Sequence, residues 1–214
     1  MKRVKMNTTI KSIASGKVKN YTFGENSFTS AYKKDNFLDT IKVTTLGLVE
    51  DEQADDRFHG GVDKAIHIGS YTHIEKNPNF DKLFIGCNIL VNTIDENEVC
   101  IGDVYNIGEV VVEVTQPRQP CWKIGALFGK KSSRYISKNH ATGWYVRILK
   151  EGTINKNDQM SLEKRVSLIT IKELSTYLKV PPTNKELIDE ILNLESIAQS
   201  YKNDFLSTLN KNHK

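Results

Sequence analysis

Residues 99–115 read VCIGDVYNIGEVVVEVT, and this stretch decides the class of fold that we expect. Two turns, Gly102-Asp103 and Gly108-Glu109, separate short runs of apolar and β-branched residues. β-Branched side chains favour strands, and a glycine beside a polar residue is typical of the tight turn of a hairpin. The stretch therefore predicts consecutive short strands of a β-barrel or a compact sheet.

The regions on both sides of this stretch continue the pattern of short strands. Further strands are predicted at residues 10–16, 30–35, 39–44 and 143–149. Short helices are expected at residues 70–77 and 132–138. The fold class that we predict is mainly β, a barrel with short helices.

From residue 161 onward the pattern changes from strands to helices. Ile171, Leu174 and Leu178 recur at helical spacing, and two prolines at 181–182 end that helix. Two more amphipathic helices are expected at residues 185–194 and 196–209. We therefore predict a β-barrel domain at residues 1–160 and a small three-helix domain with a polar tail at residues 161–214.

The composition is that of an ordinary globular protein. The chain has 214 residues, of which 38% are hydrophobic and 26% charged, and its formal net charge is +4. This mild positive charge favours an anionic small-molecule partner. It is too small to indicate a nucleic-acid partner. No apolar run reaches the roughly 18 residues of a membrane span. Three cysteines without a C-x-x-C pair suit a reducing compartment, so a cytoplasmic protein without a membrane partner is expected.

The stretch most suggestive of chemistry is QPRQPCWK, residues 116–123, which directly follows the β-branched run. Two prolines restrict the backbone before Cys121, and a rigid loop after a strand can hold a reacting group in place. Arg118 and Lys123 lie close to Cys121 in sequence. Nearby positive charge lowers the pKa of a thiol and favours the thiolate. We interpret Cys121 as a reactive thiol. The alternative is a small buried hydrophobic residue, which is a common environment for a free cysteine.

A second stretch, DDRFHGGVDKA at residues 55–65, suits the binding of an anion. Gly60 and Gly61 permit close approach of a ligand, and successive backbone amides with Lys64 favour a group such as phosphate. The alternative is an ordinary glycine turn with a solvated salt bridge.

Three other side chains near these stretches are polar. His67 and His73 are interpreted as surface residues of a strand or helix, because the histidine spacing fits no standard zinc site. Asn88 lies in an apolar segment, where it either binds a ligand or caps a turn.

The order of these motifs resembles the MOSC family, the domain at the C-terminus of molybdenum-cofactor sulfurases that also occurs as stand-alone proteins. The resemblance is to its stand-alone, YiiM-like branch with a small C-terminal helical domain, and it covers nearly the whole chain. The motifs that carry it are GL at 47–48, DEQAD at 51–55, HGG at 59–61, DKA at 63–65, Gly86 with Asn88, IGD at 101–103, QPR at 116–118, PC at 120–121 and GWY at 143–145.

The resemblance implies a MOSC-type distorted β-barrel with a cleft for the molybdenum cofactor (Mo-molybdopterin). Cys121 is then the catalytic residue and the thiolate that binds molybdenum. The branch usually has Gly-Glu-Asn where this chain has Gly86-Cys87-Asn88, so a carboxylate is lost there. The remaining cofactor-binding residues implied are His59, Gly60, Gly61, Asp63 and Lys64 on the phosphate side, and Asn88, Gln116 and Arg118 near Cys121.

The activity implied by the resemblance is reduction of N-hydroxylated small molecules, such as hydroxylamino base analogues. The chain has no flavin or nicotinamide motif, so a separate electron-donor protein is expected. One alternative is a sulfur carrier with a persulfide on Cys121 and Cys87 as a resolving thiol. Another is a binding module whose C-terminal helices recruit a redox partner or nucleic acid. The sequence leaves open whether the protein forms a homodimer.

Overall fold

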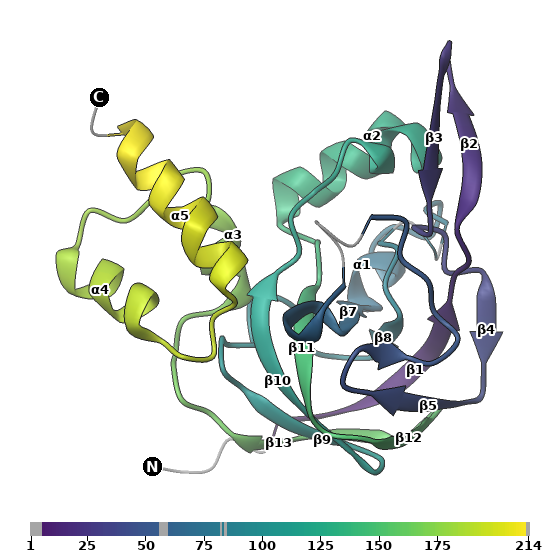
Figure 1. The fold of residues 1–214 in the computed structure, drawn as a ribbon, viewed down its shortest axis with the longest axis horizontal. Coiled ribbons are helices and arrows are strands. Elements are labelled where there is room, and N and C mark those ends of the chain that lie inside the picture. The colour runs from purple at the N-terminus through teal and green to yellow at the C-terminus, as the bar shows by residue number, and fades with distance from the viewer. Residues whose placement is uncertain (1–5, 56–59, 82, 84, 213–214) are drawn as a thin grey trace.

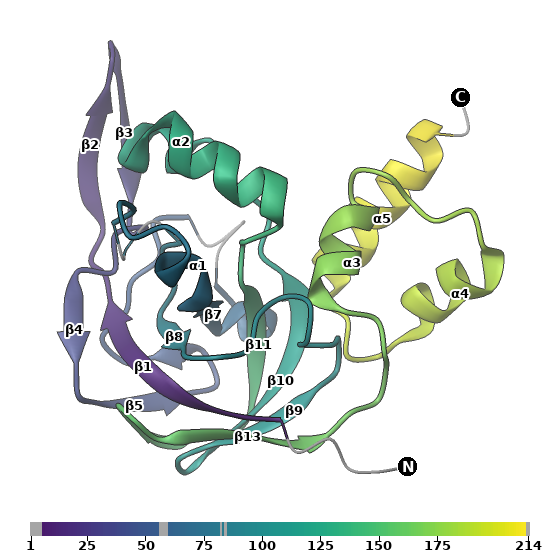
Figure 2. The same ribbon diagram turned by 180° about the vertical axis from the view of Figure 1, so that it is seen from behind.

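The architecture of the protein is that of a closed β-barrel with helices around one end and on one side (Figures 1 and 2). The computed structural model describes residues 6–55, 60–81, 83 and 85–212. The predicted fold class is confirmed, because strands close into a ring and the helices are few and short.

Seven strands form the barrel. They are hydrogen-bonded in the order β13-β9-β10-β11-β7-β8-β1, and β1 pairs back to β13. The β7–β8 pair is parallel and the other neighbours around the ring are antiparallel. The strands are β1 (Asn7–Ser15), β7 (Ile66–Ser70), β8 (Ile89–Val91), β9 (Val104–Ile107), β10 (Val110–Pro117), β11 (Trp144–Lys150) and β13 (Gln159–Lys164).

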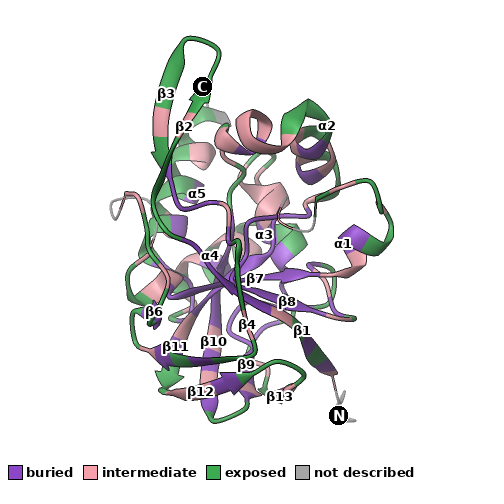
Figure 3. Cartoon of the chain, turned by 90° about the vertical axis from the view of Figure 1, so that its right-hand side faces the viewer, coloured by how far each residue is buried: buried purple, intermediate pink, exposed green. Residues whose placement is uncertain are grey.

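Six further strands of the described residues lie outside this ring. A hairpin of β2 (Lys19–Phe23) and β3 (Asn26–Ser30) projects from the barrel, and most of its residues are exposed (Figure 3). β4 (Asn36–Leu38) pairs with β1. A small sheet has the order β12-β5-β6, formed by β12 (Gly152–Asn155), β5 (Thr40–Thr44) and β6 (Gly47–Leu48).

The helices fall into two groups. A 3-10 turn (Val62–Lys64), α1 (Thr72–Glu75) and α2 (Lys123–Asn139) lie near one end of the barrel, and α2 is kinked at Gly129. The C-terminal group comprises α3 (Ile171–Tyr177), α4 (Lys185–Asn193) and α5 (Gln199–Asn212). None of the helices in the described ranges is long and apolar enough to cross a membrane.

Packing divides the interior into three apolar clusters. The largest fills the barrel, and a second lies beneath α2. The third joins Leu174, Ile191, Tyr201 and Phe205 of the C-terminal helices to Ile101 of the barrel. The apolar faces of these helices are thus used within the molecule, as expected for amphipathic helices that pack on a core.

Most of the predicted elements are present, although α2 begins at Lys123 and not at residue 132, and two predicted strands are absent. Residues 30–35 do not form a strand, because β3 ends at Ser30 and the next residues turn inward, where Ala31 and Tyr32 are buried. Residues 99–101 contribute only a bridge between Cys100 and Thr170. There the side chain of Asp103 accepts the Cys100 N–H, which closes a turn in place of a strand ladder.

The junction between the barrel and the C-terminal helices contains an ion pair with a buried carboxylate. β13 continues the barrel to Lys164, across the predicted boundary at residue 160. Arg165 follows directly and donates to both carboxylate oxygens of Asp103, at 2.7 and 2.6 Å. Tyr105 Oη also donates to Asp103, at 3.1 Å, and the Asp103 side chain is completely buried.

Replacement of Arg165 by Met should destabilise the protein strongly, because it leaves the Asp103 carboxylate buried without its cation. We expect a loss of about 3 kcal/mol in the free energy of unfolding, measured by urea titration. Arg134→Met, at an exposed arginine of α2, is the control and should change stability by less than about 0.5 kcal/mol. Equal stabilities of the two variants would show that the Asp103 pair contributes nothing.

Candidate functional site

The candidate site is a hollow beside the end of β10, which we call the inner hollow. Five segments line it, residues 30–34, 51–54, 60–67, 86–88 and 118–123, together with Tyr145. The hollow encloses about 640 Å³ of space, its open mouth included. This volume lies within the range of about 300–1,000 Å³ that is usual for sites of small molecules and cofactors.

Cys121 lies at the entrance of this hollow, in the loop between β10 and α2. Its carbonyl accepts the Ile124 N–H at 3.0 Å, so the thiol sits immediately before the first turn of α2. Cys121 is half-buried, whereas Cys87 and Cys100 are buried. The prediction of a loop that holds Cys121 at a strand end is therefore confirmed.

A second hollow, which we call the outer hollow, adjoins the inner hollow at Cys121. It shares Lys64, Arg118, Cys121, Lys123 and Tyr145 with the inner hollow. Its other lining residues include Asp55, Gln116, Trp122 and, from α5, Asp204. The thiol thus stands between two hollows, and three cations line both of them.

Arg118 brings a buried positive charge to the site. Its Nη1 donates to Tyr32 Oη at 2.9 Å and to the Ile85 carbonyl at 3.2 Å, and its guanidinium lies 4.5 Å from the centre of the Tyr32 ring. No carboxylate of the described residues contacts this guanidinium. A buried charge without a counter-ion is costly, so the site favours an anionic ligand.

Lys34 and Asp51 form a buried ion pair in the wall of the inner hollow, and sequence reasoning missed both as site residues. Lys34 Nζ lies 2.7 and 2.8 Å from the two carboxylate oxygens of Asp51. Asp51 also accepts the Gly16 N–H at 2.8 Å and Asn88 Nδ2 at 3.0 Å. Burial lowers the pKa of Lys34 from its ordinary value, against the opposing effect of Asp51. Only the inward turn of residues 31–34 brings Lys34 here, and no local pattern marks it.

The two histidines that were interpreted as surface residues are both buried, so that interpretation is wrong. His73 Nε2 lies 2.7 Å from a carboxylate oxygen of Glu96. His67 Nε2 lies 2.8 Å from the Thr142 carbonyl, and its Nδ1 lies 3.3 Å from the Gly86 carbonyl. Burial and the charge of Arg118 lower the pKa of His67 to about 3, so its ring is neutral near pH 7.

The residues predicted from the HGG segment separate in the structure. Gly60 and Lys64 line the inner hollow. Gly60 has a φ of +84°, a backbone conformation that favours glycine over residues with a side chain. Asp63 instead pairs with Arg147 at 2.8 Å, and Gly61 directly precedes the 3-10 turn. His59 lies outside the described residues.

The other predicted residues occupy both hollows. Asn88 lines the inner hollow, and its Oδ1 accepts the His67 N–H at 3.1 Å. Gln116 lines the outer hollow, and its Oε1 accepts from Ser200 Oγ of α5 at 2.8 Å. Cys87 packs in the apolar cluster beneath α2, and burial raises its pKa to about 12. This environment does not suit a resolving thiol, which reacts as the thiolate.

Within the described residues, the protein groups on their own do not form a site for a bare metal ion. No cluster of three or more His, Cys, Asp or Glu side chains among the described residues can hold one. One half-buried thiol beside several cations suits a metal whose other ligands belong to an anionic organic cofactor.

Comparisons with known proteins agree on one family. The model of the MOSC domain family matches residues 55–161. Protein YiiM of Escherichia coli is 27% identical over 198 residues, which are 88% of this chain and 87% of that protein. A protein of Gibberella moniliformis named Reductase is 32% identical over 165 residues, 72% of this chain and 29% of that protein. The crystal structure of YiiM from Geobacillus stearothermophilus is 26% identical, has a TM-score of 0.75 and matches 94% of this chain and 99% of its own.

The buried His67 should make the protein less stable in mild acid. The unfolded chain binds a proton at His67 below pH 6.5, whereas the folded chain does so only near pH 3. Because the unfolded state then binds more protons, the stability falls as the pH falls through this range. Between pH 7 and pH 5 the contribution of His67 should decrease by about 2 kcal/mol.

The measurement is urea unfolding of the parent and of His67→Gln at both pH values. The variant keeps an N–H donor but cannot bind the proton, so its stability should decrease by about 2 kcal/mol less than that of the parent. An identical decrease in both proteins would contradict a neutral, buried His67.

Proposed function

The chain belongs to the MOSC domain family, which is associated with binding of the molybdenum cofactor, and we propose that it is a molybdenum-cofactor-dependent reductase of N-hydroxylated small molecules. The observation that carries this proposal is the position of Cys121 between two hollows that share Lys64, Arg118 and Lys123. The relative named Reductase supports a redox activity for this family branch.

The chemistry of the donor set fits the cofactor. A single soft thiolate from Cys121 suits molybdenum, which receives its other sulfur ligands from the dithiolene of the pterin. The pterin carries a phosphate, and Lys64, Lys123 and Arg118 supply the positive charge to bind it. The opposite charges of Lys34 and Asp51 cancel in their ion pair, so the Asp51 carboxylate does not reduce the positive charge of Lys64, Lys123 and Arg118.

The residues implied by family resemblance have different roles in this proposal. Gly60 lets the backbone approach the phosphate closely, and Asn88 and Arg118 support the inner wall near Cys121. Gln116 faces the outer hollow, where a substrate has access to the same thiol region. Asp63 acts indirectly, because its pairing with Arg147 ties the segment that carries Gly60 and Lys64 to β11.

The reaction that we propose consumes two electrons and two protons. The N–O bond of the substrate breaks, the nitrogen gains one of the two protons, and the hydroxyl takes the other and leaves as water. When bound, the cofactor supplies the two-electron chemistry, and a separate electron-donor protein reduces it. Lys34 is suited to hold one proton at Nζ, because it lines the inner hollow and burial lowers its pKa. Lys34 thereby offers an acid in the inner hollow of a chain that has Cys87 in place of the usual glutamate.

A second candidate function is a sulfur carrier with a persulfide on Cys121. The observation that favours it is that Cys121, of the three cysteines, is the one that is not buried. Mass spectrometry after incubation with a cysteine desulfurase and cysteine tests this function, since a carrier gains one sulfur on Cys121.

The proposal predicts that the protein, produced in a host that synthesises the cofactor, contains both molybdenum and pterin. Cys121→Ser should lose most of the molybdenum, because a hydroxyl is a much poorer ligand than a thiolate. Elemental analysis and pterin fluorescence of the purified proteins provide the measurement.

The matched control is Cys100→Ser, which makes the same exchange at a buried cysteine near the C-terminal helices. It should keep the parent's metal content. Absence of molybdenum and pterin from the parent itself would count against the reductase and leave the sulfur carrier as the better reading.

A further inference from the structure

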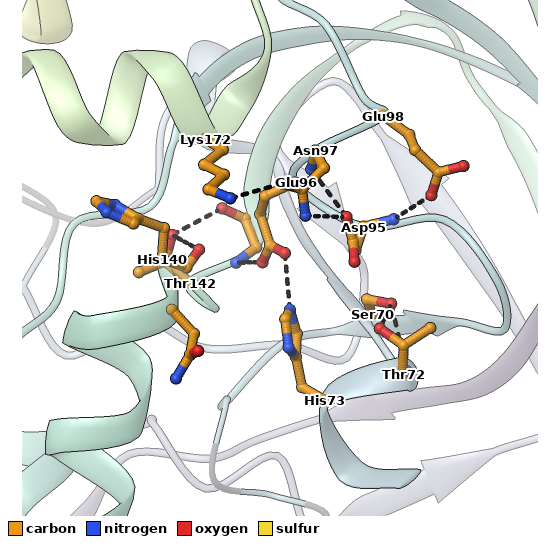
Figure 4. A network of polar contacts seen from close by, with 12 residues as sticks. Ser70, Thr72, His73, Asp95, Glu96, Asn97, Glu98, His140, Thr142 and Lys172 are labelled. Atoms are coloured by element: carbon orange, nitrogen blue, oxygen red, sulfur yellow. Dashed lines mark hydrogen bonds and ion pairs between the residues drawn. The ribbon is translucent and has the colours of Figure 1, made fainter. Parts of the chain in front are cut away.

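Glu96 is a buried carboxylate that lies outside the lining of both hollows. Its side chain is 1% exposed, and it comes from the segment between β8 and β9. One carboxylate oxygen accepts from His73 Nε2 at 2.7 Å, and the other accepts the Gly143 N–H at 2.7 Å (Figure 4). Burial of a carboxylate is costly, so two short hydrogen bonds at such a position indicate a defined role.

The peptide bond between Thr142 and Gly143 is held from both sides. Its N–H donates to Glu96, and its carbonyl oxygen, on Thr142, lies 2.8 Å from His67 Nε2. Because both ring nitrogens of His67 face carbonyl oxygens and a neutral ring has one N–H, the shorter contact assigns the proton to Nε2. Rotation of this peptide would turn its N–H toward His67, and the hydrogen bond to Glu96 prevents that rotation.

The same glycine also supports the loop that carries the thiol. The Gly143 carbonyl accepts the Arg118 N–H at 3.1 Å, three residues before Cys121. Gly143 has a φ of +70°, and a Cβ would overlap the Ile68 carbonyl and lie 2.7 Å from His67 Nε2. The backbone at Gly143 is packed too closely to accept a side chain. Because the Thr142–Gly143 peptide contacts His67 and Gly143 bonds to Arg118, a change in the orientation of this peptide would also move those two residues.

Glu96 is itself fixed by the C-terminal helices. Its backbone carbonyl accepts the Lys172 N–H of α3 at 2.9 Å, and Lys172 Nζ donates to the neighbouring Asn97 at 2.8 Å (Figure 4). The carboxylate therefore connects α3 and α1, through His73, to the wall of the inner hollow.

We propose that Glu96 is a positioning residue, which fixes the orientation of the Thr142–Gly143 peptide and with it the Nε2–H tautomer of His67 and the backbone of Arg118. The effect of Glu96 on catalysis rests on the proposed function. Its effect on the geometry of the site can be measured without cofactor or substrate. The two can therefore be tested separately.

The test compares Glu96→Ala and Glu96→Asp with the parent by two measurements on the cofactor-free chain. Imidazole nitrogen chemical shifts report the tautomer of His67, and hydrogen exchange reports the protection of the Arg118 amide. Both variants should populate a second tautomer and exchange the Arg118 amide about tenfold faster, because the Gly143 N–H loses an acceptor within hydrogen-bond distance. Aspartate is shorter by one methylene and keeps the charge, so the Glu96→Asp variant provides the test if the alanine variant fails to fold.

Glu96→Gln is the conservative rescue, because its amide oxygen can still accept the Gly143 N–H. It should keep the parent tautomer and Arg118 protection. Glu98→Gln is the matched control, the same exchange at an exposed glutamate two residues away, and it should change neither measurement.

Two outcomes would overturn the proposal. One is a folded Glu96→Asp or Glu96→Ala variant with the parent tautomer and unchanged exchange at Arg118. The other is an equal rise in exchange at Arg118 and in β1 and β8, which would show general loss of stability. Because neither measurement uses the cofactor, failure here is distinguishable from absence of molybdenum in the parent.

Discussion

The pairing of β1 with β13 is the constraint on which the rest of the structure depends. β1 pairs with β13 through its first residues and with β8 and β4 farther along, so one strand both closes the ring and spans it. Closure satisfies the backbone hydrogen bonds that an open sheet would leave at its edges. It also fixes Ala14 and Gly16 at the site, where they contact the side chains of Asn88 and Asp51.

The site combines strong polar contacts with a buried charge, that of Arg118, which the described residues leave without an ionic partner. Lys34 and Asp51 satisfy each other, and Asn88 connects them to His67. Arg118 has hydroxyl and carbonyl partners but no counter-ion in the described part of the chain. A wall held by such contacts keeps its geometry without a ligand and offers an anion a positive charge to pair with.

Burial assigns different chemistry to residues of the same type. Cys121 is half-buried between two hollows, whereas Cys87 lies in an apolar cluster where burial raises its pKa to about 12. His67 is kept neutral by burial and by Arg118, and it serves as a hydrogen-bonding part of the wall. These differences arise from desolvation and neighbouring charge, which act only after the chain has folded.

The sequence by itself determined the elements whose signals are local. The β-branched runs specified β9, β10 and β11, the apolar spacing after residue 161 specified the C-terminal helices, and two prolines marked the loop that holds Cys121. The order of the motifs indicated the family. These features depend on side chains a few residues apart, so a linear pattern contains them.

Only the tertiary structure decided which polar residues meet. Lys34 and Asp51 are 17 residues apart, His73 and Glu96 are 23 apart, and Glu96 and Gly143 are 47 apart. It also turned residues 31–34 inward, buried two histidines and directed Asp63 to Arg147. Such pairings depend on how the barrel closes and on which polar groups lose contact with water. Neither of these can be inferred from a period or a spacing along the chain.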